Sequence, residues 1–137
     1  MGTRKAVRTA LDLREALGAS QETSEQLLSL YIPDKDRHGA ELGTQRKWIL
    51  EAALILAAMG GGVTIMPAVE GGWMTLEKAI IWEHPVVVYS YVKPRLFLEQ
   101  LPRLHKFLHR LGRETNQGEV VVEFDGRFYR ITKFDSA

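Results

Sequence analysis

Residues 27–39 read LLSLYIPDKDRHG, and this apolar run that breaks into a charged loop decides the fold. Leu28, Leu30 and Ile32 alternate with their neighbours in the way that a strand requires, and the following proline ends the pattern. We therefore expect a central strand that carries the charged residues of the loop to one end of a sheet. These residues are Asp34, Asp36, Arg37 and His38.

The segment after the loop, residues 44–59, predicts a helix with Thr44 as its N-cap and Gly60 as its stop. Its apolar side chains lie on more than one face, with Trp48, Ala52, Ile55 and Met59 on one stripe and Leu50, Leu54 and Ala57 away from it. One sheet face cannot cover a helix that is apolar nearly all round. We therefore expect the N-terminal helix or a second subunit to cover its back.

The middle of the chain predicts two further strands and a second helix. Residues 63–66 form the second strand, and residues 68–78 form a long excursion that contains two glycines and a tryptophan. The third strand covers residues 80–82 and 86–92, with an interruption at 83–85 because proline cannot donate to a sheet ladder. An amphipathic helix then ends at Gly112, with Pro102 in its first turn and Phe97 just ahead of it.

The last part of the chain predicts a β-hairpin. Asp125 and Gly126 separate two β-rich runs, and this dipeptide is a strong signal for a two-residue turn. The register that follows pairs Phe124 with Arg127, Val122 with Tyr129 and Val120 with Ile131. This register leaves one largely apolar face.

The order of these elements predicts an α+β fold. A first helix over residues 3–17 and a polar connection precede two βαβ halves, and the hairpin follows them. This order is typical of a ferredoxin-like βαββαβ antiparallel sheet with helices on one face. We expect one domain over residues 1–137, with a helical extension at 1–26 and the core at 27–131.

Composition indicates an ordinary globular chain. It has 137 residues, of which 45% are hydrophobic and 26% charged, with a net charge of +1. The absence of cysteine excludes disulfides and thiolate metal sites and agrees with a reducing compartment, so the cytoplasm is the simplest expectation. The longest apolar run, residues 48–59, is far shorter than the roughly 20 residues that cross a bilayer, so no membrane partner is expected.

Several segments together resemble the PII-like small signalling proteins of the uncharacterised type. They are LYIPDKDRHGAEL, GGGVTIMPAVEGGW, HPVVVYSYV and the helix led by FLEQLPRL, and the resemblance covers roughly residues 27–112. The family's Asp-Arg-His-Gly turn is matched by Asp36, Arg37, His38 and Gly39. The resemblance implies a homo-oligomer, usually a trimer, that binds nucleotides or small effectors between subunits. The loop at 67–79 is short for this family, and a dimer is equally compatible.

The expected ligand site lies where the acidic turn, His84 and the turn at 113–118 approach one another. Amide side chains can recognise a base, sugar or amide edge, and Glu114 offers a base. The ligand-binding candidates are Asp36, Arg37, His38, His84, Arg113, Glu114, Asn116 and Gln117.

An enzyme is the first alternative. Carboxylates at the end of the first strand, paired across a dimer, would hold Mg²⁺ for a metal-dependent hydrolase or nuclease. Its catalytic candidates are Asp34, Asp36, His38 and Glu114. A calcium loop starting at Asp34 is disfavoured because its twelfth position is Gln45 where a glutamate is required.

The helix before Gly112 carries two further patterns. His105 and His109 are spaced as zinc-binding histidines are, but a third ligand would have to come from afar, such as His38 or His84, so we assign them to solvent and assign no metal. A basic stripe also lies opposite the leucines, formed by Arg103, Lys106, Arg110 and Arg113. Such stripes usually solvate a helix, and contact with nucleic acid is only weakly indicated.

The favoured interpretation is therefore a PII-like regulatory or interaction protein that binds a small-molecule effector as a homo-oligomer, dimer or trimer, without catalysis of its own. No cofactor is identified. The alternatives are the metal-dependent hydrolase and an antitoxin-like module that binds a protein partner.

Overall fold

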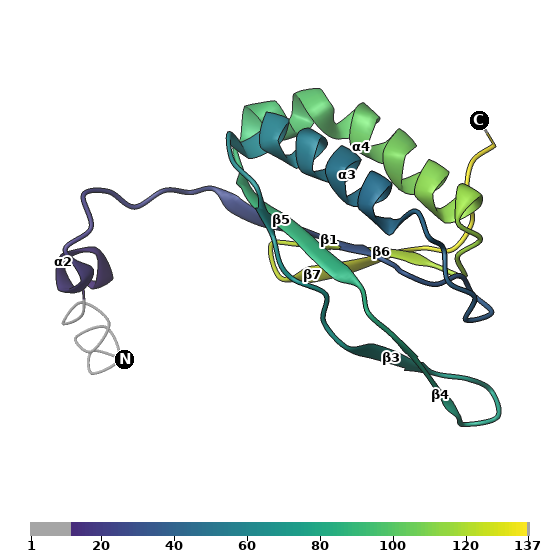
Figure 1. Cartoon of the computed structure of the whole chain (residues 1–137). Coiled ribbons are helices and arrows are strands. Elements are labelled where there is room, and N and C mark those ends of the chain that lie inside the picture. The colour runs from purple at the N-terminus through teal and green to yellow at the C-terminus, as the bar shows by residue number, and fades with distance from the viewer. Residues whose placement is uncertain (1–11, 137) are drawn as a thin grey trace, which may run out of the picture.

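A computed structural model describes residues 12–136 and has an α+β fold (Figure 1). Two long helices lie side by side on one face of an antiparallel sheet, and a two-stranded hairpin projects from the sheet on the other side. The elements are α2 (Leu13–Leu17), β1 (Gln26–Ile32), α3 (Gln45–Gly60), β2 (Thr64–Ile65), β3 (Gly71–Met74), β4 (Ile80–Glu83), β5 (Val86–Val92), α4 (Pro94–Glu114), β6 (Val120–Phe124) and β7 (Arg127–Ile131).

The main sheet has five strands in the order β2-β5-β1-β6-β7. All of its pairings are antiparallel, and β1 lies at the centre between β5 and β6. The first four positions reproduce the ferredoxin-like order, in which each βαβ unit is split by a strand of the other. The β6–β7 hairpin has the predicted register, with Phe124 opposite Arg127. The α+β, ferredoxin-like prediction with a C-terminal hairpin is confirmed.

The core lies between this sheet and the two helices. Alternate residues of β1 point toward α3 and α4 and are at most 1% exposed, and Trp48 of α3 packs against Phe107 of α4 with ring centroids 5.9 Å apart. Because side chains alternate along a strand, the intervening residues lie on the opposite face of the sheet. We call this opposite face the open face.

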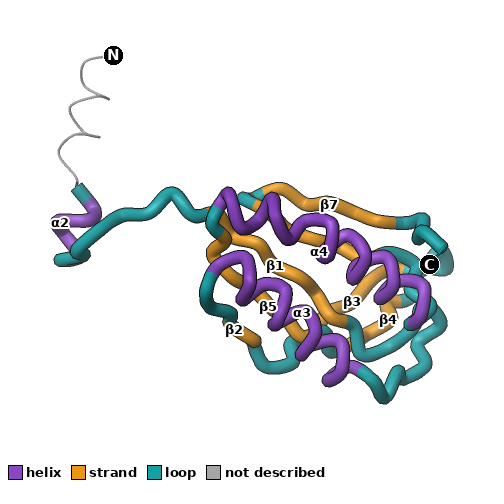
Figure 2. The backbone as a smooth tube through the Cα atoms, turned by 90° about the horizontal axis from the view of Figure 1, so that it is seen from above, coloured by secondary structure: helices purple, strands orange, loops and turns teal. Residues whose placement is uncertain are grey.

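The back of α3 is not covered in the way that the sequence suggests. Leu50 and Leu54 are 47% and 64% exposed. The described part of the N-terminal helix, α2, buries no residue and lies away from the sheet beyond an extended connection (Figure 2). The described part of the N-terminal helix therefore does not cover α3, because it has no buried side chain to hold it there; cover by a second subunit, the other alternative, stays a prediction. The rest of the predicted helix, residues 3–11, lies outside the described residues.

The expected single third strand is also wrong. Residues 80–83 leave the main sheet and pair with residues 71–74 as the hairpin β3–β4, so the excursion between strands is itself a two-stranded sheet. Pro85 separates β4 from β5 because it has no N–H for a ladder. Gly72 allows close pairing, since a Cβ there would lie 2.9 Å from Ile80 Cγ2.

Helix α4 begins earlier than predicted. Pro94 occupies its first turn, and both Phe97 and Pro102 lie inside it. Proline is favoured at a first turn but removes a hydrogen bond in a helix interior. Burial of four apolar side chains after Pro102 compensates for that loss, namely Leu104, Phe107, Leu108 and Leu111. No helix within residues 12–136 has the length and apolar character to cross a membrane.

Candidate functional site

A cavity of about 700 Å³ lies at one end of the open face. Tyr31 of β1, Val121 of β6 and Phe128 of β7 contribute its sheet side, and the hairpin strand β3 contributes the wall across from them. Residues of the turns at 33–37 and 117–119 and residues on either side of the β3–β4 hairpin complete the lining. Its size is in the range of small-molecule sites, which is about 300–1,000 Å³. We call it the open-face cavity, and it is lined by Tyr31, Pro33, Asp36, Arg37, Val69, Glu70, Gly71, Gly72, Trp73, Glu83, Pro85, Gln117, Gly118, Glu119, Val120, Val121, Phe128 and Thr132.

The open-face cavity is acidic and aromatic. Among its described lining residues Arg37 is the only cation, and the carboxylates are Asp36, Glu70, Glu83 and Glu119. Glu119 is partly balanced by Arg130, whose Nε lies 3.7 Å from it. Tyr31, Trp73 and Phe128 supply aromatic faces. Carboxylates and aromatic faces both attract cations, and an aromatic face also stacks on a flat heterocycle. The lining therefore suits a ligand that combines positive charge with a planar ring.

Glu83 is the carboxylate whose surroundings are least favourable to charge. Burial raises the pKa of Glu83, and the negative charge of Asp34 raises it further, while Lys35 acts in the opposite direction. A carboxylate held in this way gains more from a bound cation than a fully hydrated one does. Glu83 is accordingly the side chain of the cavity best suited to hold a cationic ligand.

Asp36 has the opposite environment. Its Oδ1 accepts the backbone N–H groups of His38 at 2.8 Å and Ala40 at 3.0 Å. These hydrogen bonds hold the pKa of Asp36 below its ordinary value, and the bond from Ala40 has the larger effect. Asp36 is therefore ionised at neutral pH, and it also fixes the shape of its own turn.

Tyr31 is held by a hydrogen bond across the open face. Its hydroxyl donates to Glu123 Oε1 at 2.6 Å, and Glu123 lies on the neighbouring strand β6. This bond, with burial and the charge of Glu123, raises the pKa of Tyr31 to about 12. The phenol stays neutral at physiological pH, and its ring is fixed as part of the cavity wall.

The acidic turn and the turn after α4 are joined, as the sequence analysis expects. The Arg37 backbone N–H donates to the Asn116 carbonyl at 3.0 Å, and Gln117 Nε2 donates to the Lys35 carbonyl at 2.8 Å. The His84 backbone N–H donates to Asp34 Oδ1 at 2.9 Å, which brings the end of β4 to the same place. Three segments far apart in the sequence are thus joined by hydrogen bonds into one rim.

The predicted ligand residues divide into two groups. Asp36, Arg37 and Gln117 line the open-face cavity, and the others hold its rim or lie outside it. Asp34, His84 and Asn116 act through the hydrogen bonds described above, and His38 contributes its backbone N–H to Asp36. Arg113 and Glu114 belong to the end of α4, where Arg113 donates to the Asp135 carbonyl and Glu114 lies 3.7 Å from Arg110.

The sequence-based site lacks most of the lining residues, among them Tyr31, Trp73, Glu83 and Phe128. The strand alternation in residues 27–32 already places Tyr31 on the face opposite Leu28 and Leu30, so the sequence could have predicted its position on the open face. Trp73 and Glu83 reach the cavity only because residues 71–83 fold back as a hairpin. That hairpin has no two-residue turn signal of the kind that marks the β6–β7 hairpin.

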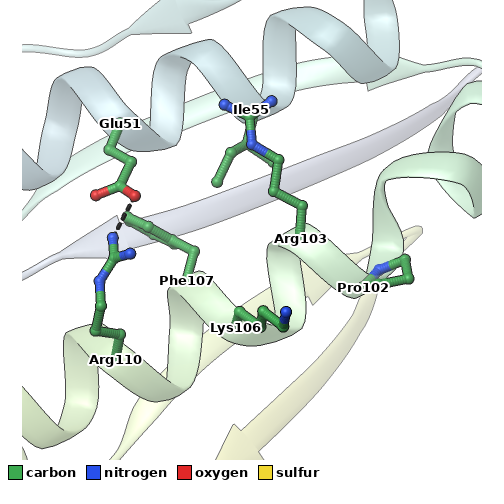
Figure 3. Close-up of a pocket in the computed structure, with 7 residues that line it drawn as sticks. All are labelled: Glu51, Ile55, Pro102, Arg103, Lys106, Phe107 and Arg110. Atoms are coloured by element: carbon green, nitrogen blue, oxygen red, sulfur yellow. Dashed lines mark hydrogen bonds and ion pairs between the residues drawn. The ribbon is translucent and has the colours of Figure 1, made fainter. Parts of the chain in front are cut away.

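A second, smaller cavity of about 390 Å³ lies between α3 and α4 (Figure 3). The basic stripe borders it through Arg103, Lys106 and Arg110. Figure 3 shows Arg110 reaching across to Glu51, with which it forms an ion pair, and its guanidinium lies 5.3 Å from the Trp48 ring centroid. Arg110, one residue of the basic stripe, therefore links α4 to α3. The open-face cavity is larger and has the more varied chemistry, and it is the better candidate site.

No family model and no curated protein matches the chain. Among solved structures, it is similar to a phage SAM lyase in complex with S-methyl-5'-thioadenosine, with a TM-score of 0.57 and 14% sequence identity over 82% of this chain and 92% of that one. A phage SAM lyase in the apo state is similar with a TM-score of 0.55 and 15% identity, over 87% of this chain and all of the other. At this level of identity, the likeness establishes a shared α+β fold.

The comparison also corrects the functional expectation from the sequence. Both similar structures are of an enzyme that acts on SAM, and neither is a PII-like regulator. The prediction of a small-ligand-binding regulatory protein without catalysis of its own is wrong, because the similar structures are of a lyase. A ferredoxin-like order of strands and helices is shared by proteins with unrelated activities, so the fold alone does not specify a regulator.

Proposed function

We propose that this chain is an enzyme that cleaves S-adenosylmethionine (SAM) and releases S-methyl-5'-thioadenosine, with the open-face cavity as its active site. The observation that carries the proposal is the likeness over 82% of the chain to a SAM lyase in complex with that thioether. The chemistry of the cavity lining supports it independently. SAM has a flat adenine ring, a cationic sulfonium, an ammonium group and a carboxylate.

Each part of SAM has a suitable partner among the lining residues. Trp73 and Phe128 offer faces for the adenine ring, and the carboxylate of Glu83 offers compensation for the positive charges. Arg37, the cation of the lining, suits the substrate carboxylate. In this assignment the acids select a cationic thioether derivative over neutral nucleosides.

The reaction that releases this thioether breaks the bond between the sulfonium sulfur and Cγ of the amino acid part. The bonding electron pair goes to sulfur, which becomes neutral. A lyase adds no water, so Cγ takes its new bond from within the fragment. The substrate's own carboxylate is placed to close a five-membered lactone, forming a C–O bond as the C–S bond breaks.

This step removes a positive and a negative charge together, and such a step is faster where water is excluded. The apolar part of the lining serves that purpose, through Pro33, Val69, Pro85 and Val121. We therefore expect catalysis to depend on how the cavity excludes water and folds the substrate. A protein base is not required for ring closure.

The test is to incubate the purified protein with SAM and to follow S-methyl-5'-thioadenosine by liquid chromatography and mass spectrometry. Proton NMR of the four-carbon product separates ring closure from elimination, because the lactone and the vinyl amino acid have the same mass but different proton signals. Absence of the thioether with the unmodified protein would refute the proposal.

A matched pair of variants tests the assigned site. Glu83→Gln removes one negative charge from the cavity, and Glu77→Gln makes the same change on the exposed loop of the same hairpin, outside the cavity. We expect KM for SAM to rise about tenfold in Glu83→Gln, which corresponds to about 1.4 kcal/mol, and to stay unchanged in Glu77→Gln. Equal kinetics in the two variants would place the active site elsewhere.

A further inference from the structure

The segment 132–136 returns along the end of α4, on the helix side of the sheet (Figure 1). Its position depends on a glycine. A Cβ at Gly112 would lie 2.1 Å from the Phe134 ring, so the ring occupies the space that a side chain would take. Arg113 donates to the Asp135 carbonyl, which adds a polar attachment. Phe134 and Arg113 thus place Asp135 over the preceding turns of the helix.

Asp135 meets two histidines there. His105 and His109 are one turn apart with stacked rings, whose centroids are 4.3 Å apart. His105 Nε2 lies 2.8 Å from Asp135 Oδ2, and His109 Nδ1 lies 3.7 Å from the same oxygen. The three potential ligand atoms all lie within 4.8 Å of one another. The third group that the two-histidine spacing lacked is therefore supplied by a residue 26 positions farther along.

We propose that His105, His109 and Asp135 bind a divalent transition-metal ion of the zinc class, and that this ion fastens the segment 132–136 to α4. Two imidazoles and a carboxylate are a common zinc ligand set, with bonds of about 2.0–2.2 Å that place ligand atoms roughly 3.3 Å apart. The distances from Asp135 Oδ2 to the two ring nitrogens bracket that value. Imidazole ligands favour zinc, cobalt, nickel and copper over magnesium and calcium.

Binding exchanges two hydrogen bonds for metal bonds. His105 Nε2 gives up its contact with Asp135, so its proton moves to the other ring nitrogen, and His109 Nδ1 gives up the Asp135 backbone N–H at 2.9 Å. The side chains of His105 and Asp135 are 57% and 67% exposed, so both can make this adjustment and water can fill the fourth position. His109 is 13% exposed, and it fixes the site against the helix.

The experiment is calorimetric titration of the full chain with Zn²⁺, repeated with Mg²⁺, and followed by Co²⁺ as a probe whose visible spectrum reports nitrogen and oxygen ligands. We expect one Zn²⁺ per chain, no binding of Mg²⁺, and a rise in Tm of roughly 5–10 °C at a zinc concentration a hundred times Kd. His105→Gln and Asp135→Asn should each weaken binding at least tenfold. Circular dichroism of each metal-free variant verifies that it is folded.

His38→Gln is the matched control, because His38 is one of the two histidines outside this cluster. It should bind Zn²⁺ as the unmodified chain does. Absence of zinc binding would overturn the proposal. Unchanged affinity in Asp135→Asn would also overturn it, because the ion would then sit on a pair of helix histidines and would not fasten the segment 132–136.

Discussion

Removal of the Tyr31 hydroxyl tests how the open face is held together. In Tyr31→Phe the ring remains as part of the cavity wall, but the hydrogen bond to Glu123 Oε1, 2.6 Å long, is lost. The bond joins the central strand β1 to β6, so its loss acts on the sheet without creating a hole in the core. Glu123 lies on the open face, where water can take the place of the hydroxyl.

The magnitude follows from the pKa of Tyr31, which is raised from 10.0 to about 12. At 1.36 kcal/mol per pKa unit, this shift would correspond to a stabilisation of the folded state by roughly 2.7 kcal/mol. The pair is only part-buried, so solvent screening reduces the value. We expect Tyr31→Phe to lower the free energy of unfolding by about 1 kcal/mol, which lies within the range for a typical net hydrogen bond.

The dependence on pH has a definite sign. The folded pKa of Tyr31 is raised, so the stabilisation is complete below the unfolded value of 10.0 and is lost as the pH rises toward about 12. The difference in stability between the unmodified chain and Tyr31→Phe should therefore be constant at neutral pH and disappear over that interval. Glu123→Gln should bring the pKa of Tyr31 back toward 10.0.

The assay is urea unfolding followed by circular dichroism at several pH values, with phenolate absorbance to follow the ionisation. Tyr129→Phe is the control, because Tyr129 is 50% exposed and makes no side-chain hydrogen bond among the described residues. The reasoning is refuted if Tyr31→Phe and Tyr129→Phe are equally stable at neutral pH. It is also refuted if Glu123→Gln leaves the ionisation of Tyr31 unchanged.

Three other changes have outcomes that the structure specifies. Gly112→Ala should lower the free energy of unfolding by about 1–3 kcal/mol, because the added Cβ would clash with the Phe134 ring. In a Phe134→Ala background the same change should raise the free energy of unfolding by up to about 1 kcal/mol, because alanine has the higher helix propensity. Thermal unfolding of the two pairs of variants measures the sign. Asp36→Ala should be less stable than the unmodified chain at neutral pH, and the difference in stability should vanish as the pH falls through the lowered pKa of Asp36. Asp36→Asn keeps an acceptor oxygen, so its free energy of unfolding, measured in urea, should fall by less than that of Asp36→Ala. Gly72→Ala should destabilise the β3–β4 hairpin by about 1 kcal/mol, because its Cβ lies 3.0 Å from Trp82 Cε3, and hydrogen exchange of the hairpin amides measures the change.

Much of the candidate site was within reach of the sequence. The apolar alternation before Pro33 identifies β1 and places the acidic turn at its end, and that turn supplies Asp36 and Arg37 to the open-face cavity. The expectation that the turn at 113–118 approaches it is confirmed by the bond from Arg37 to Asn116. These successes share a cause: topology determines which loops meet at one end of a sheet once the strand order is known.

The functional residues that were missed depend on long-range packing. Glu83 lies in the predicted interruption of the third strand, and it lines the cavity because residues 80–83 pair with residues 71–74 as a separate hairpin. Asp135 lies beyond the predicted core, which ends at residue 131, and it reaches His105 because Phe134 fits over a glycine. Neither contact has a periodic pattern, because each joins residues that are close in space and not related by a helix or strand repeat.

The sequence by itself determined the α+β class, the central strand, the apolar helix that follows it and the register of the terminal hairpin, because these depend on local periodicity and turn chemistry. The tertiary structure alone decided that the open face carries an acidic and aromatic cavity and that two histidines acquire a carboxylate. Both features need side chains from separate segments to converge, and that convergence is set by which faces bury their apolar surface. A local pattern specifies the face that a residue occupies, while packing specifies what lies across from it.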